Sequence, residues 1–118
     1  MSNHPPELDW PFFDPAHREF KTRLDAWCQH YLADTHHDDS RNAVDAECIR
    51  LVRLLGNGGW LQHAVSGTAY GASSDVIDTR KLCLLRETLA FHNGLSDFAF
   101  AMQGLGTGAI SLFGTPEQ

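Results

Sequence analysis

Apolar residues recur every three or four positions in four separate segments of this 118-residue chain. That spacing places them on one face of a helix, because an α-helix completes a turn in 3.6 residues. Leucine and alanine also greatly outnumber valine and isoleucine, and unbranched side chains keep more rotamer freedom in helices. We therefore predict an all-α fold. The expected helices of this small bundle of about four main helices are Pro15–Ala33, Ala43–Leu55, Asp75–His92 and Asp97–Phe113.

Helix-capping residues determine where these segments begin. Asp14 followed by Pro15 is typical of a helix start, because the carboxylate can accept a first-turn N–H and proline needs no partner there. The third helix has Ser74 or Asp75 as its candidate cap. The fourth has Ser96 or Asp97, after an Asn93-Gly94 pair that ends the third.

The third predicted helix carries apolar residues on more than one face, so we expect it to be contacted on two sides and to be the most buried of the four. Before it, residues 60–73 lack a helical period and are rich in glycine, which predicts an irregular connection. We expect this connection to be anchored against the core by Trp60, Leu61 and Tyr70. The apolar residues of the third helix are Ile77, Leu82, Leu84, Leu85, Leu89 and Phe91.

Charge and cysteine content exclude several classes of protein. A net charge of −6 without a run of lysine or arginine argues against binding to nucleic acid or to an anionic membrane surface. Cys28, Cys48 and Cys83 are widely spaced and form no CxxC pair, so neither a disulfide framework nor a thiolate zinc site is indicated. The first ten residues lack the basic end and apolar run of a signal peptide. We expect a cytoplasmic protein.

Two short motifs could carry chemistry, and each has a simpler interpretation. The run 104–108, Gly-Leu-Gly-Thr-Gly, follows no strand, so it predicts a helix rather than a phosphate-binding loop; Gly104 and Gly108 share one face and would let a partner or ligand come close. The run His36 to Asp39 contains metal-ligand types, but adjacent loop residues do not converge on one ion, which favours a solvated loop. No catalytic residue or metal site is predicted.

Four segments, taken in order, give a more specific indication. The segments "LLGNGGWL", "AYGASSD", "LLRETLAFHNGLSD" and "LFGTPEQ" resemble the N-terminal helical domain of the acyl-CoA dehydrogenase family. The resemblance covers about Phe12 to the C-terminus, and it implies an N-terminal extension at 1–13 and a helical domain at 14–118 that ends at the boundary with a β-domain. Ala72 and Ser74 replace glycines of the family loop, and Thr88 replaces a second glutamate, so the chain resembles a diverged member.

The resemblance implies part of a flavoprotein oxidoreductase of fatty acid metabolism. Such enzymes use FAD to remove hydrogens from Cα and Cβ of an acyl-CoA thioester, and their catalytic base and most of the flavin site lie in later domains. This chain alone would then hold no FAD and catalyse nothing. Its partners would be acyl-CoA, the remaining domains and, in a homo-oligomer, further copies of itself. The residues at the family's acyl-tail positions are Asp97, Phe98, Ala101 and Leu105.

Two alternatives remain open from the sequence. Phe98 and Leu105 could simply fill the core, because apolar residues at helical spacing usually do so. The whole chain could also be a standalone helical module that binds a partner protein, or a degenerate remnant of a larger gene.

Overall fold

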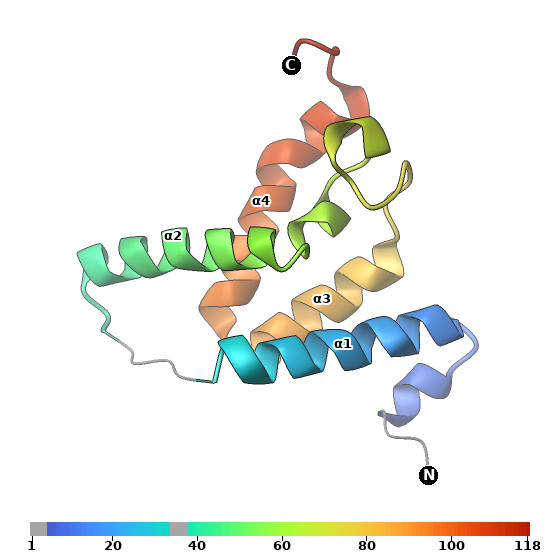
Figure 1. The fold of residues 1–118 in the computed structure, drawn as a ribbon, viewed down its shortest axis with the longest axis horizontal. Coiled ribbons are helices and arrows are strands. Elements are labelled where there is room, and N and C mark those ends of the chain that lie inside the picture. The colour runs from blue at the N-terminus through green and yellow to red at the C-terminus, as the bar shows by residue number, and fades with distance from the viewer. Residues whose placement is uncertain (1–4, 34–37) are drawn as a thin grey trace.

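The computed structural model of the protein describes residues 5–33 and 38–118. These residues form helices and loops and no strand, which confirms the predicted all-α fold with four main helices (Figure 1). The α-helices are α1 (Pro15–Tyr31), α2 (Arg41–Asn57), α3 (Thr79–His92) and α4 (Gly94–Phe113). Three short 3₁₀ turns accompany them: η1 (Pro6–Asp9), η2 (Leu61–Ala64) and η3 (Thr68–Tyr70).

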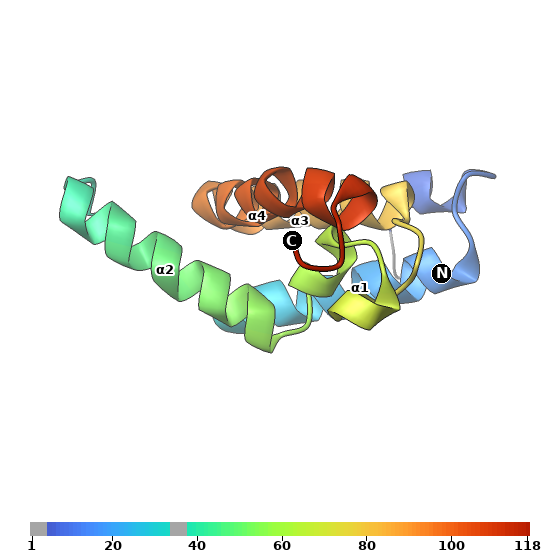
Figure 2. The ribbon, with the colours of Figure 1, turned by 90° about the horizontal axis from the view of Figure 1, so that it is seen from above.

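The helices form a thin plate of 45 × 41 × 18 Å. Its thickness corresponds to two layers of helices, because one helix with its side chains is about 10 Å across. In Figure 2, α3 and α4 lie along one face of the plate and α1 lies along the other. Helix α2 contacts α4 and η2, while its first turns extend away from the other helices (Figures 1 and 2).

Helix α3 packs against both α1 and α4, as its two-faced apolar pattern predicts. Leu84, Leu85 and Leu89 are buried in the core together with Leu24 of α1 and other apolar side chains. Phe91, which belongs to the same predicted pattern, is instead 84% exposed at the end of the helix. The core also includes Phe20, Cys28, Leu51, Leu55, Trp60 and Phe100.

Helix α3 begins four residues later than predicted, at Thr79, because Asp78 caps it. The Asp78 carboxylate accepts the backbone N–H groups of Arg80 and Lys81. Asp75, one of the two expected caps, instead accepts the backbone N–H and the hydroxyl of Thr68 at 2.8 and 2.7 Å. These contacts shape the loop before α3.

Helix α4, by contrast, begins earlier than predicted. The Asn93 side chain accepts the N–H of Ser96 at 2.9 Å, so the helix starts at Gly94 rather than at Asp97. Asn93 is both the last cap of α3 and the first cap of α4, because it adopts an extended backbone between the two helices. The two helices are therefore joined by a single residue.

Only part of the predicted anchoring of residues 60–73 is confirmed. Trp60 is 4% exposed, and its ring lies edge-on to the rings of Phe20 and Trp27. The distances between ring centroids are 5.6 and 5.8 Å. The prediction for Tyr70 is wrong, because its side chain is 61% exposed. Its ring covers Gly67, whose φ of 102° strains any residue with a Cβ.

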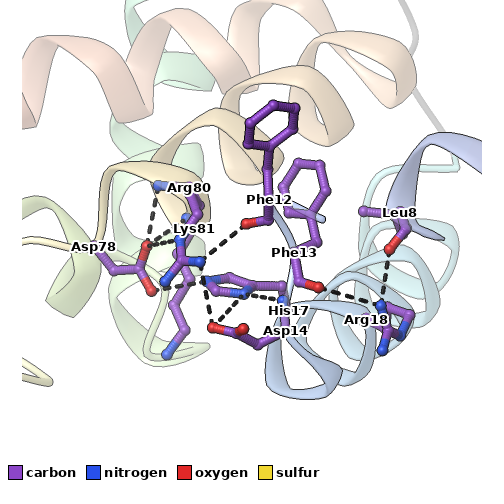
Figure 3. A network of polar contacts seen from close by, with 9 residues as sticks. All are labelled: Leu8, Phe12, Phe13, Asp14, His17, Arg18, Asp78, Arg80 and Lys81. Atoms are coloured by element: carbon purple, nitrogen blue, oxygen red, sulfur yellow. Dashed lines mark hydrogen bonds and ion pairs between the residues drawn. The ribbon is translucent and has the colours of Figure 1, made fainter. Parts of the chain in front are cut away.

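A network of polar contacts connects the segment before α1 with helices α1 and α3 (Figure 3). Arg18 donates to the carbonyl oxygens of Leu8 and Phe13 at 2.9 and 3.3 Å, and Arg80 donates to that of Phe12 at 2.9 Å. Leu8 itself is 1% exposed. The described part of the predicted extension therefore packs onto the helical core.

His17 lies at the centre of this network and is 2% exposed (Figure 3). Its Nδ1 accepts the backbone N–H of Asp14 at 3.0 Å, and its Nε2 lies 2.9 Å from Oδ2 of Asp78. Since Nδ1 accepts a hydrogen bond, the proton of the neutral ring is assigned to Nε2, which donates to Asp78. One side chain thereby connects the N-terminus of α1 with that of α3.

Candidate functional site

An apolar groove of about 620 Å³ lies between α3 and α4, and it is the cavity that contains predicted acyl-tail residues. It is open to solvent along one side, because Leu105 on its rim is 74% exposed. Helix α3 contributes Leu82, Cys83 and Arg86 to the lining, and α4 contributes Phe100, Ala101, Gly104, Leu105 and Gly108. Ala64 and Ile77, from the connection before α3, complete it.

Small residues on α4 leave the volume of this groove open. The glycine-containing run 104–108 lies inside α4, which confirms the helical interpretation of that run. A Cβ placed on Gly104 would lie 3.7 Å from that of Ala64, and one placed on Gly108 would meet nothing within 4 Å. No other backbone in the described chain approaches these two glycines closely. Their missing side chains therefore leave space in the groove that a ligand could occupy.

The structure brings two of the four predicted site residues together in the groove. Ala101 and Leu105 line it, whereas Phe98 does not and is 57% exposed. Asp97 lies beside the groove and is paired with Arg86. The alternative in which Phe98 and Leu105 fill the core is wrong, because both side chains are exposed.

A bidentate ion pair lies at the groove, because one of its two partners, Arg86, is part of the lining. Nε of Arg86 lies 2.5 Å from Oδ1 of Asp97, and its Nη2 lies 3.0 Å from Oδ2. This hydrogen bonding raises the pKa of the Arg86 guanidinium, so the side chain stays charged and is neutralised by its partner. The sequence analysis did not identify Arg86 as part of the site. Only the one-residue junction at Asn93, which turns α4 back along α3, brings residues 86 and 97 together.

The three cysteines differ in their surroundings, and all are free thiols. Cys83 is exposed on the groove lining. Burial, together with the nearby Asp25 carboxylate, raises the pKa of the Cys28 thiol to about 12, so Cys28 behaves as an unreactive core side chain. Cys83 is thus the most accessible nucleophile next to the groove.

One serine–histidine contact is present that the sequence analysis did not find. Oγ of Ser73 lies 3.1 Å from Nδ1 of His63, beside a small cavity of about 130 Å³. Burial and the charges of Lys81 and Arg23 lower the pKa of His63, so the imidazole is neutral. The carboxylate whose charge raises the pKa of His63, Asp78, is already bound to His17 and to the first turn of α3. A complete hydrolytic triad is not assembled here.

A second cleft, of about 680 Å³, lies between η1, α1 and α3. Three of the side chains that line it contact one another: Nζ of Lys21 lies 2.5 Å from Oδ2 of Asp25, whose Oδ1 is 3.6 Å from Nε2 of His92. None of the four predicted site residues lines this cleft. Its lining also includes Glu7, Glu87 and the hydroxyl of Thr88, which is buried and has no hydrogen-bond partner among the described residues.

Residues 36–39, for which we predict a solvated loop, are only partly described by the structure. His36 and His37 lie outside the described residues, while Asp38 and Asp39 are exposed. Among residues 5–33 and 38–118, no group of three histidine, cysteine or carboxylate side chains is placed to hold a metal ion.

No helix in the described part of the chain is long and apolar enough to span a bilayer. Comparison of the sequence with protein-family models gave no match, and comparison with curated proteins gave none either. The groove and the sequence motifs are therefore the features of the chain that bear on its function.

Because Phe98 is exposed and Phe100 is buried, we expect their replacement by alanine to affect stability differently. Phe98→Ala is expected to change the free energy of unfolding by no more than about 0.5 kcal/mol, as is usual for surface positions. Phe100→Ala, the same substitution two residues along the same helix, should cost about 3–5 kcal/mol because Phe100 is 2% exposed. Urea titrations of both variants measure the difference. Equal losses of stability would mean that the face of α4 is misassigned.

Proposed function

We propose that this chain is the N-terminal helical domain of an FAD-dependent acyl-CoA dehydrogenase, and that the α3–α4 groove binds the acyl tail of the substrate. The observation that carries the proposal is that Ala101 and Leu105, taken from the family's acyl-tail positions, line the same apolar groove. The four sequence segments that resemble the family are the source of those positions, and the groove adds a structural observation to them. In this role the domain positions the substrate and catalyses nothing alone.

The chemistry of the groove suits an alkyl chain. Its volume falls within the range of about 300–1,000 Å³ that is usual for small-molecule sites. Each methylene that leaves water for such a surface contributes about 0.8 kcal/mol. The one charged side chain of the lining, Arg86, is already neutralised by Asp97, so burying a tail beside it leaves no unpaired charge.

In this proposal the α3–α4 groove holds the acyl tail and not the FAD. A flavin dinucleotide needs backbone N–H groups or free cations for its pyrophosphate. The glycines of 104–108 lie within α4, where N–H groups bond along the helix, and Arg86 is paired. The proposal therefore assigns FAD and the catalytic base to other domains of the enzyme, and no step of the reaction to this chain.

Photocrosslinking tests the groove without requiring turnover. The 118-residue chain is irradiated with a medium-chain acyl-CoA that carries a diazirine near the end of its tail, and labelled peptides are mapped by mass spectrometry. We expect the label on α3 and α4. Gly104→Leu places a side chain in the groove and should abolish most of this labelling. Gly106→Leu is the matched control, because that glycine faces open space on the same helix.

Two results would contradict the proposal. The first is labelling that Gly104→Leu leaves unchanged, and the second is labelling that lies mainly outside α3 and α4. Circular dichroism of both variants shows that each remains helical, so that a loss of label is not a loss of fold.

A further inference from the structure

The cleft between η1, α1 and α3 contains a polar atom that the fold leaves without a partner. Thr88 lies on α3 and belongs to the lining of this cleft, although it is only 1% exposed. Its Oγ1 is buried and has no hydrogen-bond partner among the described residues. Such a hydroxyl destabilises a folded protein, because it has given up hydrogen bonds to water without replacing them. A bound molecule that offers an N–H or O–H group would restore the missing hydrogen bond.

One face of each of two helices shapes the cleft. The lining residues recur every three or four positions in both helices, so each set lies along one side of its helix. In Figure 2, α1 lies in one layer of the plate, while η1 lies at the level of α3. The cleft therefore has walls from three elements. The spacing is shown on α3 by Leu84, Thr88 and Phe91, and on α1 by Thr22, Ala26 and Gln29.

The segment 5–13 forms the third wall, and hydrogen bonds hold it in place. Leu8 and Phe13 line the cleft, and Leu8 is also part of the core. Nη1 of Arg18 donates to the carbonyl oxygens of both residues, at 2.9 and 3.3 Å. A wall that is fixed in this way lowers the entropy lost on binding. The volume of about 680 Å³ lies within the range of about 300–1,000 Å³ that is usual for small-molecule sites.

The charges that line the cleft are mainly negative. Lys21 is paired with Asp25, and Asp25 is also 3.6 Å from the imidazole of His92. Glu7 and Glu87 complete the charged groups of the lining. Both are exposed, and neither carboxylate has a hydrogen bond or an ion pair with residues 5–33 or 38–118. Two carboxylates without a cation therefore lie beside the cleft.

These two carboxylates favour a cation over an anion as the ligand. A metal ion is not supported, because no three histidine, cysteine or carboxylate side chains of the described chain are placed to hold one. Leu8, Phe13 and Leu84 add apolar surface to the same space. The cation that suits the cleft is therefore organic and carries a hydrocarbon part.

We propose that this cleft binds a small organic amine in its ammonium form. The hydrocarbon part packs on the apolar side chains of the lining. The ammonium group is attracted by the carboxylates of Glu7 and Glu87, and one of its N–H groups donates to Oγ1 of Thr88. An ammonium group can make both kinds of contact, because it carries a full charge and several N–H donors. The α3–α4 groove shares no lining residue with this cleft, so the proposal is independent of the acyl-tail site.

Isothermal titration calorimetry of the 118-residue chain tests the charge preference. Three probes share a phenyl ring and a two-carbon side chain: phenethylamine, the neutral phenethyl alcohol and the anion phenylacetate. We expect the amine to bind with one molecule per chain, the alcohol to bind at least about 5-fold more weakly, and phenylacetate not to bind measurably. A dissociation constant for the amine that is no lower than those of the other two probes overturns the proposal.

Backbone amide chemical shifts, measured by NMR during the same titration, locate the bound amine. We expect the largest changes in η1, in residues 21–29 of α1 and in residues 84–92 of α3, because these segments line the cleft. If the largest changes lie in α4, the amine occupies the α3–α4 groove and the assignment of the cleft is wrong.

Charge variants separate the cleft from the overall acidity of the chain, whose net charge is −6. Glu87→Gln should raise the dissociation constant of phenethylamine at least about 5-fold. The matched control is Glu19→Gln, which removes the same charge at an exposed α1 position outside the lining. Because solvent and salt screen exposed charges, it should change the constant less than about 2-fold. Equal effects of the two variants would mean that the chain attracts amines non-specifically, and would overturn the site.

Thr88→Val tests the buried hydroxyl through two measurements. Valine keeps the branched shape and removes the oxygen, so phenethylamine should bind about 10-fold more weakly. The midpoint of urea unfolding should equal or exceed that of the parent chain, because a methyl group replaces a hydroxyl that has no partner in the fold. An unchanged affinity for phenethylamine, or a lower urea midpoint, would show that the hydroxyl serves the fold rather than a ligand. Either result overturns the proposal.

Discussion

Replacement of Leu85 by alanine is expected to reduce the free energy of unfolding by about 2–5 kcal/mol. Leu85 is fully buried on α3, the helix that packs against both α1 and α4. Its truncation removes the transfer free energy of the lost methyl groups and leaves a cavity that two rigid neighbours cannot fill. A domain of this size has a total stability of only about 5–15 kcal/mol, so the variant should be close to unfolding at moderate temperature.

Urea titration followed by circular dichroism measures this loss. Ile49→Ala is a suitable control, because it removes a side chain of the same carbon number that is 55% exposed on α2. That substitution should change stability by no more than about 0.5 kcal/mol. If both variants unfold at the same urea concentration as the parent chain, Leu85 is not part of the core.

The number and type of the helices could be predicted because the signals for them are local. Apolar spacing within α1, from Phe20 to Cys28, is enough to define a helix before any partner is known. The start of α3 was harder to predict, since Ser74, Asp75 and Asp78 are all good cap residues. The choice is made by a distant contact: Asp78 meets His17, sixty-one residues earlier, while Asp75 is used by Thr68.

The candidate site was only partly predictable for the same reason. Helical spacing correctly places Ala101 and Leu105 near each other, but it does not say which direction α3 approaches from. That direction decides that Phe98 points to solvent rather than into the groove, and that Arg86 reaches Asp97. Local sequence contains no signal for either result, because both depend on the packing of one helix on another.

The second large effect is expected at Asp78, where a single carboxylate caps α3 and binds the buried His17. Asp78→Ala should cost about 1.5–5 kcal/mol. Loss of a helix cap contributes about 0.5–2 kcal/mol, and the Nε2–H of His17, left buried without a partner, adds about 1–3 kcal/mol. Asp78→Asn is the informative control. Its amide oxygen can replace Oδ1, which caps the helix, but its NH2 group then replaces Oδ2 and cannot accept the Nε2–H of His17. It should recover only the cap contribution of about 0.5–2 kcal/mol, and full recovery of stability would contradict the assigned contact with His17.

The same contacts predict how stability depends on pH. Burial raises the pKa of Asp78, but the hydrogen bonds from His17 and from the backbone of Lys81 and Arg80 lower it by more, so the pKa in the folded state lies below the ordinary value of 3.8. The unfolded chain therefore binds a proton more readily than the folded protein does. The stabilisation from this carboxylate is fully present well above pH 3.8 and is lost as the pH falls through the folded-state pKa. We expect Asp78→Asn, which cannot titrate, to lose less stability than the parent chain between neutral pH and this acidic range. Urea midpoints measured across the range test it, and parallel pH profiles for the two proteins would show that Asp78 does not contribute to acid unfolding.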